Sequence, residues 1–390
     1  MSLTVTAISE ADSFGEQVAE LLEYGGKGRV ETASGFGKRL CSRGRDAGME
    51  RLRLSNHTFE GHNNAYLFRD EETVLVDTGD WLPDTREQLD DALASHDVAV
   101  ADLDRIFITH WHGDHSGLAG PLQAESGAEV YVHAADAPLV AGEQEAWEQL
   151  KRKQQQYCRE WAMPDEKQAI LEEVLHDMVE AEETATVTTM ADGETFSLGA
   201  HTLEVVHAPG HAAGLCLFET TLDGESVALS SDALLPRYTP NVGGADVRVD
   251  DALAKYLDTL EAIADAGYAR AWPGHRDPIA DPTARAEEII HHHEERAYRV
   301  LDVLRERGPC DAWTVSAELF GELTGIHILH GPGESYAHLE HLENAGLIGS
   351  DADDGGDRVS YDLADGTAAR LDDYDDRWPL VSDRNEKVSY

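Results

Sequence analysis

The amino-acid sequence predicts an α/β fold in four layers, with two β-sheets packed face to face and helices on their outer sides. Two observations support this prediction. Short apolar runs followed by an amphipathic segment occur at residues 63–95, and the same pattern returns at residues 194–264. Two similar halves of this kind imply two sheets, each covered by helices on one side.

The first half begins with two strand-like runs, Asn63–Phe68 and Thr73–Gly79, which the charged turn at residues 69–72 joins into a hairpin. Apolar residues at helical spacing then predict a helix at Thr85–Ser95. A further strand is expected at Glu129–His133, where β-branched and aromatic residues gather.

Residues 138–183 are rich in helix-forming residues and are expected to form a helical insertion, which Trp161–Pro164 divides into two helices. Two roles stay open for the large apolar side chains of this insertion. They either form its own core or line a substrate pocket. These side chains are Trp147, Tyr157, Trp161 and Met163.

The second half contains four strand-like runs, at residues 194–199, 201–206, 215–218 and 227–230. A helix is expected next at Lys255–Ala264, whose apolar residues share one face. His207 follows one of these strands and is expected to have a structural or supporting role. We expect a structural role for His133 as well.

From about residue 296 onward the pattern changes to three helices and a hairpin, which is typical of a winged-helix-like domain. The expected elements are a helix at Arg296–Arg307, a helix with Thr314 as N-cap, a helix at Glu334–Asn344 and a hairpin at residues 347–363. The chain therefore divides into an N-terminal extension (1–50), a central domain (51–295) and a C-terminal domain (296–390).

The third of these C-terminal helices carries Glu334, Glu340 and Glu343. A helix that reads duplex DNA needs Arg or Lys instead, so the sequence argues against duplex DNA as a partner. We expect this helix to pack against the rest of the chain or against a partner subunit.

Metal-ligand residues gather in one loop directly after the strand-like run Ile106–Ile108. His110, His112, Asp114 and His115 place three imidazoles and a carboxylate within six residues. On an extended backbone, side chains two residues apart point to the same side. Such nitrogen and oxygen donors suit zinc or a similar first-row metal. The sequence therefore predicts a metal site at this loop.

Three further candidate ligands follow strand-like runs later in the chain. His211 comes after the strand at 201–206, Asp232 after the strand at 227–230, and His275 after residues 268–272. Loops at strand ends are positioned by a rigid sheet, and they often carry ligands and catalytic groups.

These motifs resemble those of the metallo-β-lactamase superfamily. The resemblance rests on His-x-His-x-Asp-His at 110–115, Pro-Gly-His at 209–211, Asp232 after a strand and Gly-His at 274–275, in this order. It covers about residues 57–290. The run at residues 333–342 also resembles the C-terminal module of a group with glyoxalase II-like and β-lactamase-like endoribonuclease members.

The resemblance implies two divalent metal ions, with zinc expected and manganese or iron as alternatives. The implied ligands are His110, His112 and His211 for one ion, Asp114, His115 and His275 for the other, and Asp232 as the bridge. Asp77, which follows a strand of the first half, would support the metal loop without binding metal.

The resemblance also implies a hydrolase whose nucleophile is a hydroxide bridging the two metals, with Asp114 and Asp232 as its catalytic carboxylates. A small ester-like molecule, such as a thioester or a lactone, is the expected substrate. Two alternatives are a phosphodiesterase or endoribonuclease of the same fold, and a mononuclear iron oxygenase acting on persulfides. The complete set of seven candidate ligands favours two metals over one and an enzyme over a binding module.

The chain is strongly acidic, with 76 Asp and Glu against 31 Lys and Arg and a net charge of −45. Only seven of its basic residues are lysines. This balance resembles that of proteins from halophiles, and at ordinary salt it argues against a broad phosphate-binding surface.

The sequence has neither an apolar run of about 18 residues nor an N-terminal signal core. We therefore expect a cytoplasmic protein that does not contact a membrane, and a homodimer is one possible assembly. The cysteines form no Cys-x-x-Cys pair and are expected to be free thiols. They are Cys41, Cys158, Cys216 and Cys310.

Overall fold

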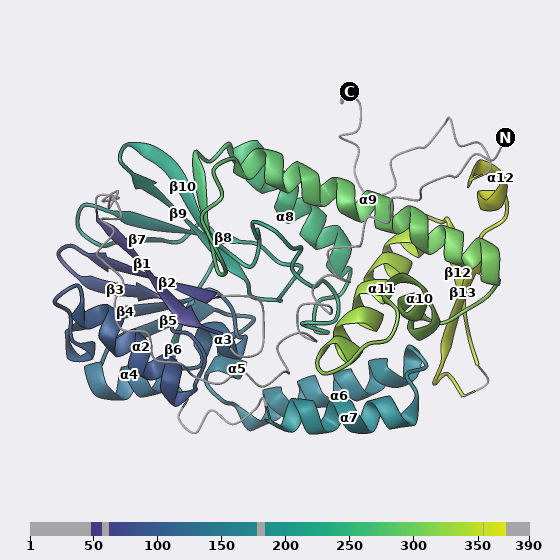
Figure 1. The fold of residues 1–390 in the computed structure, drawn as a ribbon, viewed down its shortest axis with the longest axis horizontal. Helices are drawn as coiled ribbons and strands as arrows, with labels where there is room; N and C mark the ends of the chain where they lie inside the picture. Colours follow the sequence, from purple (N-terminus) through teal and green to yellow (C-terminus); the bar gives the residue numbers. More distant parts are fainter. Residues whose placement is uncertain (1–47, 57–61, 178–183, 354, 372–390) are drawn as a thin grey trace, which may run out of the picture. The chain divides into compact units, whose positions relative to one another are not determined.

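The computed structural model of the protein describes residues 48–56, 62–177, 184–353 and 355–371. These residues all belong to one compact unit, Asp46–Tyr390, which is built on two large sheets and the helices around them (Figure 1). Residues 1–47 of the expected N-terminal extension, including Cys41, lie outside the described residues. The other three cysteines are free thiols, as expected.

The first sheet has six strands in the order β1-β2-β3-β4-β5-β6. They span Met49–Ser55, His62–Arg69, Thr73–Val76, Arg105–Ile108, Glu129–His133 and Val187–Met190. β1, β2 and β3 pair antiparallel, whereas β3 to β6 pair in parallel. β2 and β3 are the predicted hairpin, in which Arg69 pairs with Thr73.

The second sheet has five strands in the order β11-β10-β9-β8-β7. In chain order from β7 they span Thr195–Ser197, Thr202–His207, Cys216–Leu222, Glu225–Ser231 and Arg270–Pro273. Neighbours from β7 to β10 are antiparallel, and β10 is parallel to β11. Consequently β8, β10 and β11 run in the same direction, and their C-terminal ends lie at the same end of the sheet.

Alternation along the strands produces two apolar cores. Phe107 of β4 points toward the second sheet, where its ring centroid lies 4.9 Å from that of Phe196 and 5.6 Å from that of Phe218. Its neighbours Ile106 and Ile108 point the other way and pack with apolar residues of α2 and α4. One strand therefore contributes to both cores, because successive side chains of a strand face opposite sides.

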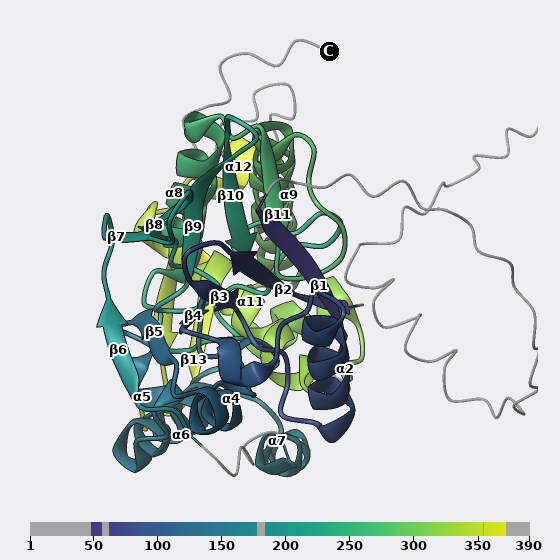
Figure 2. The ribbon, with the colours of Figure 1, turned by 90° about the vertical axis from the view of Figure 1, so that its left-hand side faces the viewer.

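Helices lie beside both sheets. α2 (Pro83–Ala94) and α4 (Ala119–Ser126) lie beside the strands of the first sheet, and α8 (Ala252–Ala266) and α9 (Pro282–Arg307) lie beside those of the second (Figure 2). Shorter helical segments are η1 (Val100–Asp102), α3 (Gly113–Ser116) and α5 (Ala137–Val140). The α/β arrangement of two mixed sheets and outer helices confirms the predicted fold class.

The expected insertion contains α6 (Gln144–Glu160) and α7 (Asp165–Asp177), which a turn at the predicted break separates. Trp161 and Met163 in this turn are only 1% and 2% exposed. The Trp161 ring centroid lies 5.2 Å from that of Tyr157 and 5.8 Å from that of Tyr336 in α11 (His327–Asn344). These side chains therefore form a core against the C-terminal part of the chain.

The C-terminal part contains α10 (Ala312–Phe320), α11 (His327–Asn344), the hairpin β12 (Ile348–Ala352) and β13 (Val359–Leu363), and α12 (Thr367–Leu371). α9 has no break at residue 296, so the helix expected to start there is the second half of a longer one.

Two further helix starts differ from the prediction. The N-cap of α10 is Asp311, whose carboxylate accepts a 2.8 Å hydrogen bond from the backbone N–H of Thr314, so Thr314 lies inside the helix. α11 begins at His327 instead of Glu334. Gly331, Pro332 and Gly333 have poor helix propensity, which conceals its first turns in the sequence.

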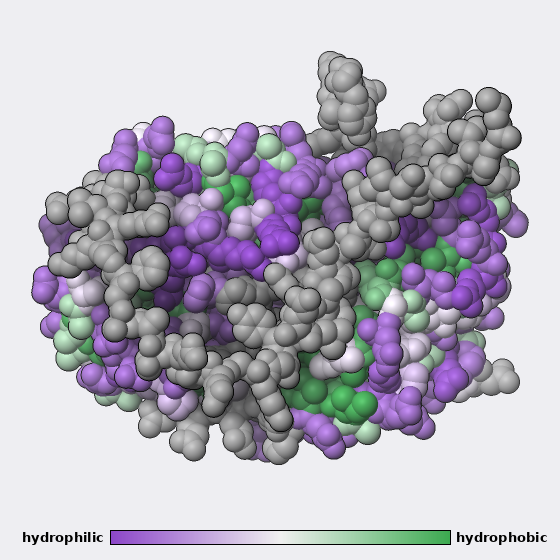
Figure 3. Space-filling view, in the orientation of Figure 1, coloured by the Kyte–Doolittle hydropathy of each residue, from purple (hydrophilic) through white to green (hydrophobic). Residues whose placement is uncertain are grey.

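Hydrophilic residues cover most of the described surface on the face shown in Figure 3. Ile170 of α7 is the one large apolar side chain that is well exposed among the described residues, at 44%. None of the helices in the described part of the chain combines the length and the apolarity needed to cross a membrane.

Candidate metal centre

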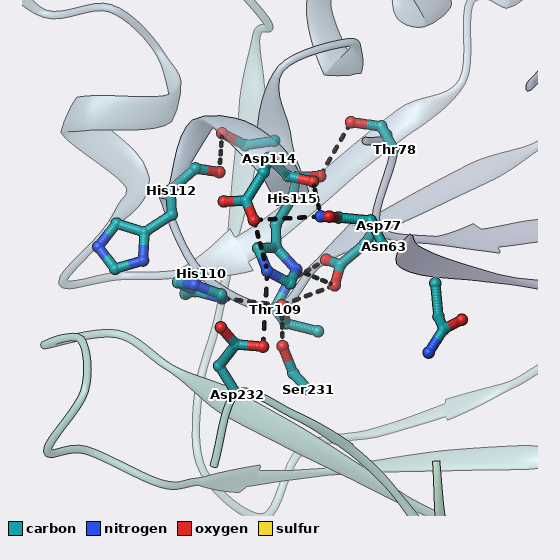
Figure 4. A network of polar contacts seen from close by, with 12 residues as sticks. Asn63, Asp77, Thr78, Thr109, His110, His112, Asp114, His115, Ser231 and Asp232 are labelled. Atoms are coloured by element: carbon teal, nitrogen blue, oxygen red, sulfur yellow. Dashed lines mark hydrogen bonds and ion pairs between the residues drawn. The ribbon is translucent and has the colours of Figure 1, made fainter. Parts of the chain in front are cut away.

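The predicted ligands stand on loops that leave the C-terminal ends of four strands. β4 leads to His110, β8 to His211, β10 to Asp232 and β11 to His275. The first strand belongs to one sheet and the other three belong to the second. All seven predicted ligands fall into overlapping groups of close neighbours. Figure 4 shows five of them together, namely His110, His112, Asp114, His115 and Asp232.

The first group consists of His110, His112 and His211, whose ligand nitrogens lie within 4.8 Å of one another. Nδ1 of His112 is 3.1 Å from Nε2 of His211. The outer nitrogens of these two rings face backbone carbonyls. Nε2 of His112 is 3.2 Å from the oxygen of Ala245, and Nδ1 of His211 is 2.8 Å from the oxygen of Asn241.

These carbonyl contacts decide which nitrogens can bind a cation. A carbonyl oxygen only accepts hydrogen bonds, so in a neutral ring the outer nitrogen carries the proton and the inner nitrogen presents a lone pair. Two lone pairs 3.1 Å apart repel unless a cation lies between them. The distance is close to the roughly 3.3 Å expected between two nitrogens bound to one tetrahedral zinc ion.

Protonation states in the first group also suit a ligand role. Burial, followed by the neighbouring His115 and His112, lowers the pKa of His110 well below its ordinary value. Burial and the adjacent His211 lower the pKa of His112 to about 4. Both rings are therefore neutral near pH 7, which is the form that binds metal.

The second group consists of Asp114, His115 and His275. Oδ2 of Asp114 is 3.6 Å from Nε2 of His115 and 3.5 Å from Nε2 of His275. Asp232 lies between the two groups. Its Oδ1 is 3.6 Å from Nε2 of His115, and its Oδ2 is 3.3 Å from Nε2 of His275 and 3.7 Å from Nε2 of His211.

Charge is balanced differently in the second group. Burial opposes ionisation of Asp232 and Asp114, but His115 and His275 hold the pKa of Asp232 well below its usual range and lower that of Asp114. Burial likewise opposes protonation of His115 and His275, but these carboxylates raise the pKa of both imidazoles. The two carboxylates therefore favour the protonated form of the two imidazoles, and a cation bound by these carboxylates would compete with that protonation.

Three buried ligand atoms have no hydrogen-bond partner within the described ranges, namely Nε2 of His110, Nε2 of His115 and Oδ1 of Asp232. The same three residues form a group whose ligand atoms lie within 4.8 Å of one another. Unpaired buried polar atoms are destabilising, and cations bound at this centre would satisfy all three. The residues present therefore fit a divalent metal.

Asp77 lies directly after β3 and supports the metal loop. Its Oδ2 is 2.8 Å from Nδ1 of His115 and accepts a 2.9 Å hydrogen bond from the hydroxyl of Thr109, while its Oδ1 accepts one from the Thr109 backbone N–H at 2.9 Å. These contacts turn Nε2 of His115 toward Asp114 and Asp232, as expected of a carboxylate that orients a metal-binding histidine.

Sequence analysis missed the asparagines around the centre. Asn63 donates to the carbonyl of Asp114 at 2.5 Å and to its carboxylate at 3.2 Å, and Asn56 donates to the same carboxylate at 3.2 Å. The adjacent Asn63 and Asn64 in an otherwise apolar strand are a signal that could have found the first one. Asn241 has no such signal, because it lies in a loop without a motif.

His133 and His207 belong to none of the ligand groups found among the described residues. Their rings stack with centroids 4.1 Å apart, and Nε2 of His207 is 2.9 Å from the carbonyl oxygen of Ala213. These contacts agree with the structural roles expected of them.

The sequence pattern of the metallo-beta-lactamase superfamily matches residues 58–275, which is more than half of the chain. The chain is 26% identical over 285 residues to "Probable metallo-hydrolase YqjP" of Bacillus subtilis, an alignment that covers 71% of this chain and 86% of that protein. It is 26% identical over 261 residues to "Lactamase-like protein nscB" of Neosartorya fischeri, covering 65% of this chain but only 61% of that longer relative.

Two solved structures resemble this one closely. A metallo-beta-lactamase family protein from Thermus thermophilus aligns with a TM-score of 0.69 and 29% identity, covering 81% of this chain and 98% of that chain. A beta-lactamase domain protein from Burkholderia ambifaria aligns with a TM-score of 0.68 and 25% identity, covering 82% and 93%. The family pattern and the buried histidine and aspartate groups together show that the chain belongs to the metallo-beta-lactamase superfamily, as one of its metal-dependent hydrolases.

Proposed function

We propose that this chain is a binuclear hydrolase of a small ester-like substrate, a thioester or a lactone. One cation would be held by His110, His112 and His211, the other by Asp114, His115 and His275, and both by Asp232. The position of Asp232 carries this proposal, because its Oδ2 faces His211 of one group at 3.7 Å and His275 of the other at 3.3 Å.

The donor set consists of imidazole nitrogens and carboxylate oxygens without thiolates, which suits zinc first and also manganese or iron. When bound, two such cations make a water molecule acidic enough to attack a carbonyl near neutral pH and stabilise the negative charge that develops. The hydroxide expected to bridge the metals is part of this proposal.

The chain's own residues would orient the reactants. The neighbouring histidines keep Asp114 and Asp232 ionised despite their burial, so both carboxylates can bind a cation. Asp77 holds His115 in place, and Asn63 does the same for Asp114. These contacts keep the two carboxylates directed at the same centre.

The net charge of −45 supports a small substrate over a polyanion at ordinary salt. A phosphodiester or RNA substrate is the second candidate, and the C-terminal run that resembles endoribonuclease relatives is what favours it. A mononuclear iron oxygenase is less well supported, because two separate ligand groups share Asp232.

The division into an extension (1–50), a central domain (51–295) with its insertion (138–183) and a winged-helix-like domain (296–390) also stays a proposal. The second half of α9, α10 and α11 would supply three helices, and β12 with β13 the wing. A cytoplasmic location, homodimer formation, and the absence of duplex DNA and membrane partners likewise remain predictions.

Asp232→Ala tests the shared carboxylate. We expect hydrolysis to fall by about 100-fold or more, because removing an oxygen that faces both groups weakens metal binding and the charge that orients water. Turnover would be measured at high salt on thioesters, lactones, phosphodiesters and short RNAs. Asp258→Ala, at an exposed position of α8, is the matched control. Wild-type turnover in a folded Asp232→Ala variant would contradict the shared role.

Metal analysis tests the number of cations. We expect close to two equivalents of zinc, manganese or iron per chain, one for each ligand group. A single tightly held iron together with oxygen uptake would favour the oxygenase instead.

A further inference from the structure

The loop at residues 241–245, between β10 and α8, provides the carbonyls that orient two of the candidate ligands. The oxygen of Asn241 lies 2.8 Å from Nδ1 of His211, and the oxygen of Ala245 lies 3.2 Å from Nε2 of His112. These contacts direct Nε2 of His211 and Nδ1 of His112 toward each other. The orientation of both rings therefore depends on what holds the 241–245 loop.

The side chain of Asn241 closes this loop and ties it to α11. Its Oδ1 accepts hydrogen bonds from the backbone N–H groups of Gly244 at 3.1 Å and Ala245 at 2.7 Å. Its Nδ2 donates to the carbonyl of His330 and to Oε2 of Glu334, both at 3.0 Å. All four hydrogen-bonding positions of this amide are thus used.

Glu334 is a carboxylate buried to 2% exposure in the middle of α11. Its Oε2 also accepts from the backbone N–H of Val242 at 3.1 Å, and its Oε1 accepts from Nη1 of Arg296 in α9 at 2.8 Å. Arg296 is itself 2% exposed. A buried carboxylate is stable only when it is paired and hydrogen-bonded, and these three donors meet that need.

The backbones of the loop and of α11 are also in direct contact. A Cβ atom on Gly333 would collide with Cα of Gly244 and stand 2.5 Å from its backbone nitrogen. A Cβ on Gly244 would stand 2.6 Å from Cα of His330. Glycine at both positions is what allows α11 to approach this loop so closely.

From these contacts we infer that Glu334 is a positioning residue of the metal centre. It holds the 241–245 loop through Asn241 and Val242, and the loop in turn orients His211 and His112. The C-terminal part of the chain thereby contributes to cation binding without supplying a ligand. The inference rests on the proposed assignment of His110, His112 and His211 to one cation, and it concerns that cation alone.

The same carboxylate belongs to another group of close donors, with His293 and His338. A metal in that group would have to share Oε1 of Glu334 with Arg296, whose guanidinium lies 2.8 Å away. Nδ1 of His293 is 3.2 Å from Nε2 of His338, and Nδ1 of His338 is 2.8 Å from the carbonyl of Glu334. Hydrogen bonds and a buried ion pair thus already engage the atoms of this group that face one another, and a third cation would have to displace them.

Cobalt(II) binding to the full-length chain tests the inference. In Glu334→Gln, which keeps the size of the side chain and removes its charge, we expect the affinity for one of the two cobalt ions to fall by about 10–100-fold in competition with a chelator. The visible absorption band that weakens should be the one lost in His110→Ala. Gly333→Ala should weaken the same band, because it displaces the loop while the carboxylate stays in place.

Two control variants separate positioning from general destabilisation. Asn63→Ala removes a donor to the carboxylate of Asp114 and should weaken the other band instead. Asp311→Ala removes the N-cap of α10, which supplies none of the contacts described above, and should leave both bands intact although it destabilises the same part of the chain.

The outcomes distinguish this inference from the proposed function. Two cobalt ions bound with wild-type affinity in a folded Glu334→Gln variant would overturn the inference alone. Loss of the band that His110→Ala removes would also overturn the inference if it occurred in Asp311→Ala. A third cobalt ion that binds to the wild type but not to Glu334→Gln would overturn it too, because Glu334 would then be a ligand. A wild-type chain that binds fewer than two ions would instead refute the proposed binuclear centre on which the inference rests.

Discussion

Gly274 precedes the candidate ligand His275 and lies directly against the metal centre. A Cβ atom at this position would collide with Oδ1 of Asp232 and stand 2.7 Å from Cε1 of His115. The backbone N–H of Gly274 also donates to the carbonyl of Ser231, and its carbonyl accepts from the N–H of Asn64. Even one added carbon atom therefore has no room at this position, because the buried side chains around it are closely packed.

Replacing Gly274 with alanine should therefore disrupt the centre. We expect Gly274→Ala to reduce cation affinity and hydrolysis by about 10-fold or more, because the added methyl group displaces Asp232 or His115. Gly349→Ala is the matched control, since a Cβ there would meet no atom within 4 Å. Metal titration and turnover of the two variants would check this, and equal values would contradict it.

The capping of α10 shows how local contacts define a single element. Asp311 accepts from the backbone N–H of Thr314, which is the third residue of the helix. A side-chain oxygen at the N-cap satisfies one of the N–H groups that a helix leaves unpaired. Both Asp311 and Thr314 suit a cap by composition, so only the backbone path determines which one serves.

The two residues should respond differently to alanine. Asp311→Ala should lower the free energy of unfolding by about 1 kcal/mol. Thr314→Ala should be nearly neutral, since alanine is favourable inside a helix. Denaturant midpoints of both variants would test the assignment. A larger loss for Thr314→Ala would mean that threonine is the cap after all.

α9 and α11 carry buried histidines that resist protonation. Burial lowers the pKa of His293 and His338 well below the ordinary value, and nearby cationic groups add to this effect. Below pH 6.5 the unfolded chain therefore binds more protons at these positions than the folded chain does. Stability from these neutral imidazoles is present above about pH 6.5 and is lost as the pH falls below it.

This linkage can be measured as a slope. In chelator, the free energy of unfolding should decrease as the pH falls from about 6.5 to 5, with each such histidine contributing up to about 1.4 kcal/mol per pH unit. His293→Gln should reduce this slope by the contribution of one histidine, because one proton fewer is taken up on unfolding. His291→Gln, at an exposed position of the same helix, is the matched control. Equal slopes for the wild type and His293→Gln would contradict the assignment.

The net charge of −45 is a property of the whole molecule. Like charges repel more strongly when the chain is compact, so acidity opposes folding at low salt. The screening length falls from about 10 Å at 0.1 M salt to about 3 Å at 1 M. Salt should therefore stabilise the folded chain although it leaves buried contacts unchanged.

Thermal unfolding in sodium chloride tests this expectation. We expect Tm to rise by at least about 2 °C between 0.1 and 1 M salt, because screening weakens the repulsion. An uncharged osmolyte such as sucrose serves as the comparison, since it acts by exclusion and without screening. A Tm that is constant or falls with salt would contradict a role for charge repulsion in stability.

The sequence alone determined the positions of the candidate ligands and most of the strands and helices that carry them. His110 to His115 lie in one motif, and His211, Asp232 and His275 each follow an apolar run that ends in a turn. Periodicity and turn residues act over a few positions, so they are visible without coordinates. Asp77 could be named as a supporting residue because the resemblance to the metallo-β-lactamase superfamily implies that role.

Only the tertiary structure decided which residues hold these ligands in position. Asn241 and Glu334 are 93 residues apart and meet at 3.0 Å, and Arg296 reaches Glu334 from another helix. Glu334 stands on a helix that the sequence predicts to pack against the rest of the chain or a partner subunit, but only the structure shows that Glu334 itself is buried. Such contacts depend on how helices and loops pack over long separations, and no local pattern of residue types records that packing.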